Sequence, residues 1–76
     1  MEDVERQYLQ EVKQEILSNP DRWQKLNVRE RDLLRVRLGL DDELFRDSFS
    51  VAQLFGLSVL RVAQIEAKAL SKFREQ

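Results

Sequence analysis

The stretch of sequence that decides the fold is residues 48–67, which read SFSVAQLFGLSVLRVAQIEA. Two helices that cross through a tight turn require small and apolar residues at fixed offsets. Ala52 is small where the two helices approach each other, and Gly56 permits the turn between them. The apolar residues that supply the shared core are Val51, Phe55, Leu57, Val62 and Ile65. This spacing favours a helix-turn-helix over an ordinary α-helical hairpin whose spacing agrees by chance.

Capping residues mark the starts of both helices of this motif. Asp47 is a candidate N-cap for a short helix that ends near Phe55. Ser58 is a candidate N-cap for the last helix, which we expect to run to about Arg74. The periodicity places five residues on the buried side of this last helix: Val62, Ile65, Ala69, Leu70 and Phe73.

The segment before the motif predicts another capped helix and a loop. Asn27 and Glu30 resemble a capping box at the start of an apolar run, and Gly39 fits the left-handed position just past the end of that helix. Residues 41–43 are acidic and predict a solvated loop. Two apolar residues follow and need apolar cover: Leu44 and Phe45.

The N-terminal segment predicts two further helices. Residues 3–18 carry one apolar stripe at helical spacing. Pro20 ends this helix, because the residue before a proline is pushed out of the helical region, and it opens a short helical turn over residues 21–26. Within this turn Trp23 is expected to be the core anchor.

Strand alternation, internal repeats and low-complexity stretches are absent from the sequence. We therefore predict an all-α fold of about five helices in a single domain, residues 1–76. Its parts are an N-terminal helical part at 1–26 and a core at 27–76, with the helix-turn-helix at 48–67.

Composition narrows the possible functions. The chain has 76 residues, 13 Lys and Arg against 14 Asp and Glu, and neither His nor Cys. The usual general base, the thiol nucleophile and the common zinc ligands are therefore missing. We expect no enzyme activity, no metal and no cofactor. No apolar run reaches the length of a membrane span and the acidic start does not resemble a signal peptide, so a cytoplasmic protein is expected.

Charge is distributed unevenly along the chain. Residues 19–40 and 58–76 are net positive, whereas 1–18 and 41–57 are net negative. The arginines of the first positive segment can form a DNA-facing surface or a solvated helix face paired with Glu30 and Asp32. In the second segment, Gln64 is suited to adenine and Arg61 to guanine or phosphate, while Val59 or Ala63 can touch thymine methyl groups. An exposed apolar pair at residues 59 and 60 equally suits a protein contact.

Two blocks of the chain resemble the fourth region of sigma-70 family transcription initiation factors: LNVRERDLLRVRLGL at 26–40 and VAQIEAKALSKFR at 62–74. The first block corresponds to the family's Leu-Thr-x-Arg-Glu opening and Arg-x-Arg-Phe-Gly helix end. The second reproduces the family's Gln-Ile-Glu-Ala-Lys-Ala-Leu run at 64–70. LuxR-type response regulators share the opening, but the second block distinguishes this chain from them.

The resemblance implies a domain that places its last helix in the major groove of the minus-35 promoter element and docks on the flap-tip helix of the RNA polymerase β subunit. Family positions near the DNA backbone correspond to Arg29, Arg35 and Arg37. Ser58 corresponds to a residue that offers a hydroxyl to phosphate. Arg61 and Gln64 correspond to readers of promoter bases, and Lys68 to a residue near DNA and bound activators.

The chain departs from the family at the start of the recognition helix. The family's Thr-Arg-Glu-Arg-Ile-Arg-Gln is replaced by SVLRVAQ at 58–64, so three charged groups are lost. Each good bidentate base contact contributes about 1–3 kcal/mol of discrimination, so specific DNA binding should weaken. The alternative function is a sigma-like adaptor that binds RNA polymerase, another transcription regulator or itself, with little specific DNA binding. Its contact residues are Val59, Leu60 and Ala63.

Overall fold

Five helices follow one another in the computed structural model, which describes residues 2–75. They are α1 (Asp3–Leu17), α2 (Pro20–Trp23), α3 (Val28–Leu38), α4 (Ser48–Phe55) and α5 (Val59–Arg74). The described residues contain no strand, so the predicted all-α fold is confirmed.

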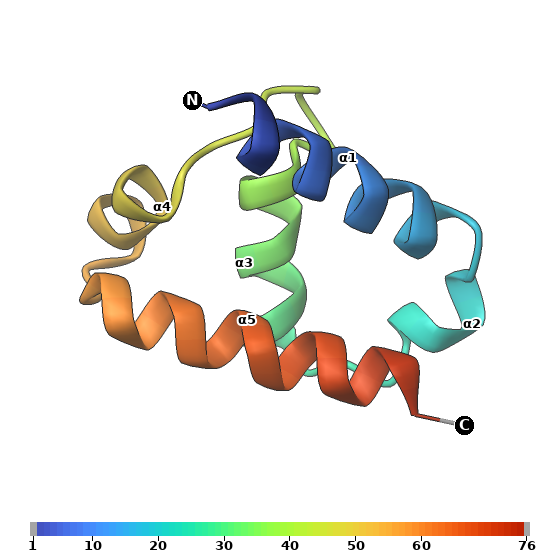
Figure 1. The fold of residues 1–76 in the computed structure, drawn as a ribbon. Helices are drawn as coiled ribbons and strands as arrows, with labels where there is room; N and C mark the ends of the chain where they lie inside the picture. Colours follow the sequence, from blue (N-terminus) through green and yellow to red (C-terminus); the bar gives the residue numbers. More distant parts are fainter. Residues whose placement is uncertain (1, 76) are drawn as a thin grey trace.

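The helices are arranged around α3 (Figure 1). In this view α1 runs along the top and α5 along the bottom, while α3 passes between them. The helix α4 lies at one end beside the start of α5, and α2 lies at the other end beside its C-terminus. The N-terminal half of α5 therefore projects beyond the cover of α1.

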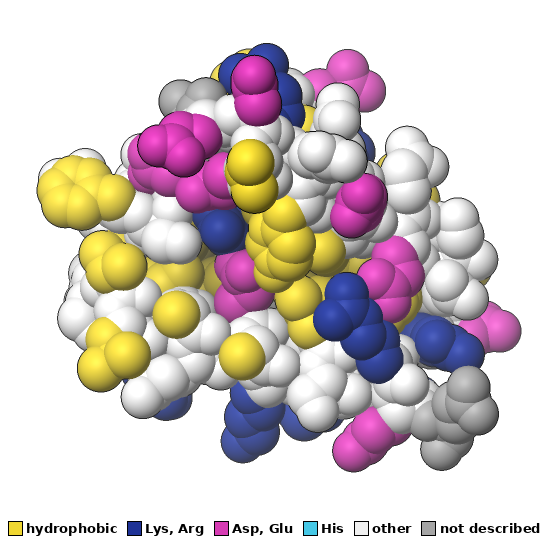
Figure 2. All heavy atoms as spheres, viewed as in Figure 1, with side chains coloured by type: hydrophobic (Ala, Val, Ile, Leu, Met, Phe, Trp, Pro, Cys, Tyr) yellow, Lys and Arg dark blue, Asp and Glu magenta, His cyan; other side chains and the backbone are white. Residues whose placement is uncertain are grey.

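Charged side chains are distributed unevenly over the face that Figure 2 shows. Figure 2 shows Lys and Arg side chains below α5 and a group of Asp and Glu side chains over the start of α1. This arrangement follows the sequence, in which the segment that contains α5 is net positive and the segment that contains α1 is net negative. The near-neutral net charge thus conceals a concentration of basic side chains below α5.

Two groups of buried residues hold the helices together. The larger joins α1, α3 and α5 with one residue of the turn between α2 and α3, and it consists of Leu9, Val12, Ile16, Leu26, Leu34, Leu38, Ala69, Leu70 and Phe73. The smaller lies between α3, α4 and α5, and it consists of Leu33, Val51, Ala52, Val62 and Ile65. The buried side predicted for the last helix is confirmed residue by residue.

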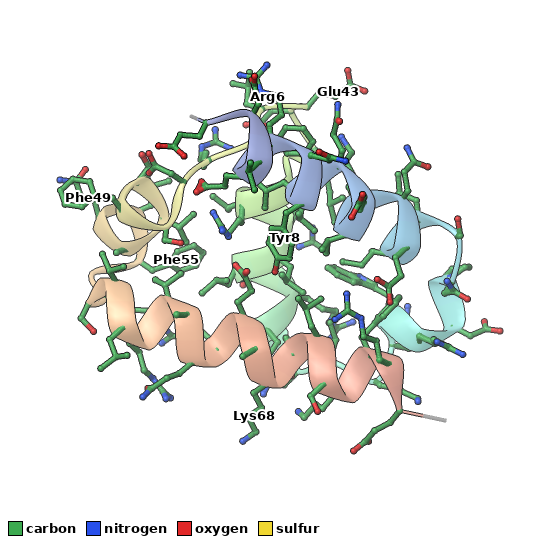
Figure 3. The ribbon with its side chains drawn as sticks, in the orientation of Figure 1. Arg6, Tyr8, Glu43, Phe49, Phe55 and Lys68 are labelled. Atoms are coloured by element: carbon green, nitrogen blue, oxygen red, sulfur yellow. The ribbon has the colours of Figure 1, made fainter. Side chains whose placement is uncertain are left out.

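The helix-turn-helix is formed by α4 and α5, whose axes meet at 101°. Its predicted core is confirmed, because Phe55 and Leu57 pack against the smaller buried group. In Figure 3, Phe55 lies between α4 and α5, whereas Phe49 points away from the molecule. Gly56 ends α4 at a φ of 66°, in the left-handed region that glycine adopts most easily.

The predicted caps are all present. Asn27 Oδ1 accepts the Glu30 N–H at 2.8 Å and Glu30 Oε1 accepts the Asn27 N–H at 3.0 Å, which completes the capping box. Asp47 accepts the Ser50 N–H at 2.8 Å, and Ser58 accepts the Arg61 N–H at 3.0 Å. These bonds satisfy N–H groups that the helices themselves leave free.

One prediction about apolar residues is confirmed and another needs correction. Trp23 packs against the larger buried group as predicted, although it is only half-buried, and Leu26 in the following turn is buried. Leu44 is 60% exposed instead of covered. Phe45 does pack against the core, with Lys13 Nζ 5.5 Å from the centroid of its ring.

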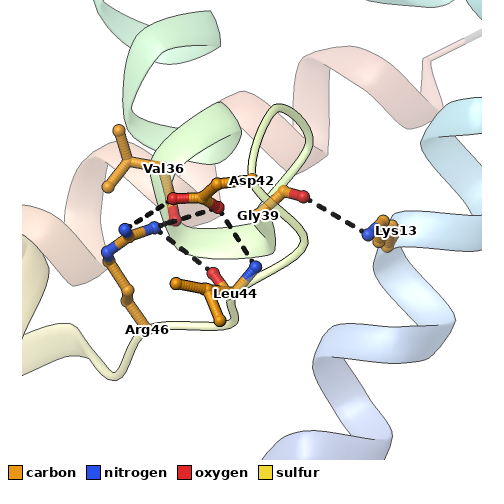
Figure 4. A network of polar contacts seen from close by, with 6 residues as sticks. All are labelled: Lys13, Val36, Gly39, Asp42, Leu44 and Arg46. Carbon is orange, nitrogen blue, oxygen red and sulfur yellow. Dashed lines mark hydrogen bonds and ion pairs between the residues drawn. The ribbon is translucent and has the colours of Figure 1, made fainter.

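The exposure of Leu44 has a local cause in the hydrogen bonds of its loop (Figure 4). Arg46 donates to the carbonyls of Val36 and Leu44 at 3.1 and 3.3 Å, and it pairs with Asp42 at 2.6 Å. The Leu44 N–H also donates to Asp42 at 3.1 Å. The loop is thus fixed through its backbone, which leaves the Leu44 side chain outside.

Within residues 2–75 no single helix is long and apolar enough to cross a membrane. The bent pair α4 and α5, taken together, has the length and composition of a membrane span.

Candidate nucleic-acid interface

The N-terminal half of α5 presents an exposed helical face. Val62 and Ile65 turn inward, which leaves the opposite side of the helix to solvent. Val59 and Leu60 in the first turn are 46% and 68% exposed. The exposed residues of this face are Ser58, Val59, Leu60, Arg61, Ala63, Gln64, Ala67 and Lys68, as the sequence predicts.

A hollow of about 110 Å³ is lined by residues of this face and of the start of α3. Its polar lining includes four of the predicted DNA-binding residues: Arg29, Arg61, Gln64 and Lys68. All four side chains are exposed, and Lys68 points away from the molecule below α5 (Figure 3). Residues from two separate segments thus form one basic edge, which we call the basic edge of α5.

The one carboxylate in this hollow, that of Glu30, is compensated. Burial would raise the pKa of Glu30, but hydrogen bonds from the Asn27 N–H and from Lys72 Nζ at 2.9 Å hold it below its usual value. Lys68 lowers it further through its charge. Glu30 therefore stays ionised and paired, and it leaves the exposed basic edge net positive.

Arg35 lies away from the basic edge. Its guanidinium is half-exposed and approaches Asp32 at 3.2 Å and Asp41 at 3.6 Å. It lines a different groove, near the C-terminal end of α3. The structure therefore does not bring Arg35 together with the residues of α5.

Arg37 is buried, which corrects the expectation that it lies near the DNA backbone. Its side chain is 6% exposed, and its Nε pairs with the Glu66 carboxylate. Its Nη1 donates to the Arg46 carbonyl at 2.8 Å and lies 4.0 Å from Glu5. Because three other segments occupy this guanidinium, it is not available to phosphate, and we leave Arg37 out of the candidate interface.

Glu66 is an organising residue that sequence reasoning missed. Besides Arg37, it accepts the Tyr8 hydroxyl at 2.8 Å, so it links α5 to α1 and α3. Burial and this hydrogen bond raise the pKa of Tyr8 to about 12. The available signal was its spacing of four residues from Val62 and from Leu70, which places all three on the inner side of α5.

Several apolar residues of α4 and α5 are exposed at the end of the molecule that carries the helix-turn-helix, and we call them together the apolar cluster. It comprises the predicted contact residues Val59, Leu60 and Ala63, together with Phe49 and Leu54 of α4, which are 63% and 65% exposed and were not predicted. Figure 2 shows hydrophobic side chains at this end of the molecule. The cluster has no partner within the described residues.

A separate apolar groove of about 200 Å³ lies where α1, α2 and α3 meet. It is lined by Ile16, Leu17, Pro20, Trp23, Gln24, Arg35 and Leu40. Among residues 2–75 there is no group of acidic side chains that could hold a metal ion. The chemistry that these surfaces offer is binding, through charge, amide groups and apolar contact.

Comparison with known proteins identifies relatives. RNA polymerase sigma factor SigA1 of Synechococcus elongatus is 41% identical over 73 residues, which are 96% of this chain and 17% of that protein. RNA polymerase sigma factors SigA of Nostoc sp. and of Bacillus sp. are each 49% identical over 49 residues, which are 64% of this chain and 13% of each relative. No protein-family model matches the chain. It spans less than a fifth of these relatives' lengths. The similarity and the five-helix fold together show that the chain forms a sigma-70 region 4-like domain.

Proposed function

We propose that this domain serves transcription initiation in the cytoplasm by binding promoter DNA of the minus-35 type through α5 while it docks on the RNA polymerase core. The observation that carries the proposal is the convergence of Arg29, Arg61, Gln64 and Lys68 on one exposed edge. Such an edge combines charges for phosphates with groups that can read bases, which is a binding function and not a catalytic one.

The roles of these residues follow from their chemistry. Arg29 and Lys68 flank the edge and contact phosphates, while Gln64 pairs with adenine and Arg61 with guanine or phosphate. Ser58 uses an oxygen lone pair to cap α5, and its hydroxyl hydrogen remains free to donate to a phosphate. Three cations at the edge correspond to a salt slope of about −2.7 in log K against log salt concentration.

The apolar groove between α1, α2 and α3 is our candidate for the polymerase contact. Leu17 and Trp23 offer apolar surface along it, and Arg35 also lines it. Such a groove suits the apolar face of a helix such as the polymerase β flap tip. The groove and the basic edge lie at different ends of α3, so both partners can be bound at once.

The test is titration of a minus-35-like duplex and a scrambled duplex by fluorescence anisotropy at about 50 and 200 mM salt. We expect preference for the promoter duplex, and we expect Lys68→Ala to weaken binding to both duplexes and reduce the salt slope by about 1. Arg6→Ala is the matched control, since Arg6 is exposed on the far side of the molecule from Lys68 (Figure 3). Equal binding of both duplexes by the wild type contradicts promoter recognition, and equal loss in both variants contradicts the assigned edge.

A second candidate function is supported by the apolar cluster. Phe49, Leu54 and Leu60 are 63–68% exposed, as expected of an adaptor that binds RNA polymerase, another transcription regulator or a second copy of the chain. The double variant Val59→Arg/Leu60→Glu should then lose capture by core RNA polymerase. Unchanged capture, together with promoter preference in the wild type, excludes the adaptor. A monomer mass that is independent of concentration in sedimentation excludes self-association.

A further inference from the structure

We infer that Val59, Leu60 and Ala63 are specificity-determining residues that contact the 5-methyl groups of thymines in the major groove. The inference rests on the proposed function, because it requires α5 to enter DNA. It gives these residues a DNA partner, and it makes the domain a reader of A·T pairs at positions where the sigma family carries charged readers.

The position of the three residues fits base contact. A recognition helix touches base edges mainly with its N-terminal residues. Val59 is the first residue of α5, directly after the cap Ser58, and Leu60 follows it. Both side chains stand in solvent, and Ala63 lies one turn further on the same exposed face. Apolar side chains at these positions can meet only one apolar group on a base edge of the major groove, the thymine methyl.

The neighbouring amide reads the other half of the same base pair. Residues four apart share a helix face, so the exposed side of α5 carries two adjacent rows. The apolar row is Val59, Ala63 and Ala67, and the row beside it is Leu60, Gln64 and Lys68. An A·T pair presents adenine N6 and N7 next to the thymine methyl. Gln64, with Leu60 before it in its own row and Ala63 in the row beside it, matches that pattern.

Charge on this face also fits DNA. The only acidic residue of α5 is Glu66, and it is turned inward to Tyr8 and Arg37. No exposed carboxylate of this helix therefore opposes a phosphate backbone. Lys68 follows Gln64 in the second row, and Arg29 lines the same hollow, so both cations can complement phosphates on the groove walls.

The helix spacing sets the expected spacing of thymines. Residues four apart rise about 6 Å along an α-helix. This corresponds to about two base steps of roughly 3.4 Å each. Val59 and Ala63 thus contact thymines about two steps apart, and the short Ala63 side chain allows the helix backbone to approach the bases closely.

The experiment removes only the methyl groups. Sequences that bind the wild-type chain are first enriched from duplexes with a randomised central stretch, and the best duplex is remade with deoxyuridine replacing one thymine at a time. We expect two thymines, about two steps apart, at which the replacement weakens binding about fourfold, the effect of one apolar carbon left uncovered. The double variant Val59→Ala/Leu60→Ala should lose the difference between thymine and uracil at the position that Val59 contacts and keep it at the position that Ala63 contacts. Its helicity, measured by circular dichroism, should match that of the wild type because both side chains are exposed.

A matched variant separates methyl contact from general binding. Arg61→Ala should weaken binding to both duplexes while preserving the ratio between them. Enrichment of a sequence in which every uracil replacement is neutral overturns the inference and leaves the proposed function standing. The absence of any enriched sequence overturns both. Neutral uracil replacements combined with loss of RNA polymerase capture in Val59→Ala/Leu60→Ala would assign the apolar cluster to a protein partner and overturn the inference.

Discussion

Replacing Gly39 by alanine should destabilise the domain far more than the same change at Gly56. Both glycines end a helix in the left-handed region, at φ of 61° and 66°. A side chain in this region costs about 1–2 kcal/mol at either site. The two sites differ in their surroundings, so the pair separates backbone strain from steric overlap.

The surroundings of the two glycines set the magnitudes. A Cβ on residue 39 would lie 2.6 Å from the carbonyl oxygen of Leu44 and 2.7 Å from its carbonyl carbon, whereas a Cβ on residue 56 would meet nothing within 4 Å. The obstacle at Gly39 is backbone that Arg46 and Asp42 hold in place, so overlap adds about 1–3 kcal/mol. Alanine also restricts the unfolded chain, which stabilises the folded state by about 0.4–1 kcal/mol at each site. We expect the free energy of unfolding to fall by about 3 kcal/mol in Gly39→Ala and by about 1 kcal/mol in Gly56→Ala.

The assay is urea unfolding followed by the circular dichroism of the helices. A domain of this length has a free energy of unfolding of about 4–11 kcal/mol, so both losses are measurable. Gly56→Asn should recover part of the loss at that site, because asparagine tolerates the left-handed region better than alanine. Equal losses in the two alanine variants would refute the close approach between Gly39 and Leu44.

Three further predictions follow from the polar contacts. Asn27→Ala removes the side-chain half of the capping box and should lower the free energy of unfolding by about 1 kcal/mol in the same urea assay, with Asn27→Ser as the conservative control. The pKa of Tyr8, the single tyrosine, should be about 12 in an ultraviolet titration of the phenolate. In Glu66→Gln this pKa should fall towards 10. A midpoint near 10 in the wild type contradicts the burial of Tyr8 and its hydrogen bond to Glu66. Because that folded-state pKa is raised, its stabilising effect is complete below about pH 10 and declines as the pH rises towards 12. The pKa of Glu30 is lowered instead, so its contribution to stability is present above pH 4.5, its ordinary pKa, and is lost as the pH falls below that value. In a series of thermal unfolding measurements at decreasing pH, Glu30→Gln should therefore show a smaller loss of stability in acid than the wild type.

Features that depend on neighbouring residues could be predicted from the sequence. The caps at Asn27 and Ser58 involve partners three residues away, and the helix-turn-helix core repeats at helical spacing around Gly56. Such patterns are visible because the chain itself fixes the geometry between the partners. For the same reason the exposed face of α5 was predicted correctly from its periodicity.

Features that depend on distant partners could not be predicted. Arg37 is basic, yet its side chain is buried because it pairs with Glu66, which is 29 residues away, and donates to the carbonyl of Arg46. The exposure of Leu44 is decided by a loop network and not by its own hydropathy. Phe49 and Leu54 were missed because α4 has only eight residues, too few turns for its periodicity to show which side is buried.

The attachment of α1 to the rest of the fold limits what can be grafted into another protein. Leu9, Val12 and Ile16 of α1 fill the larger buried group, and Glu15 holds Arg74 near the end of α5 through two hydrogen bonds of 2.9 Å. A transplanted helix-turn-helix would expose the surfaces that these residues cover, including that of Phe73. The smallest portable unit that keeps α5 in its present orientation therefore runs from α1 through α5, and a chimera that borrows only the family-like blocks must supply a substitute for α1.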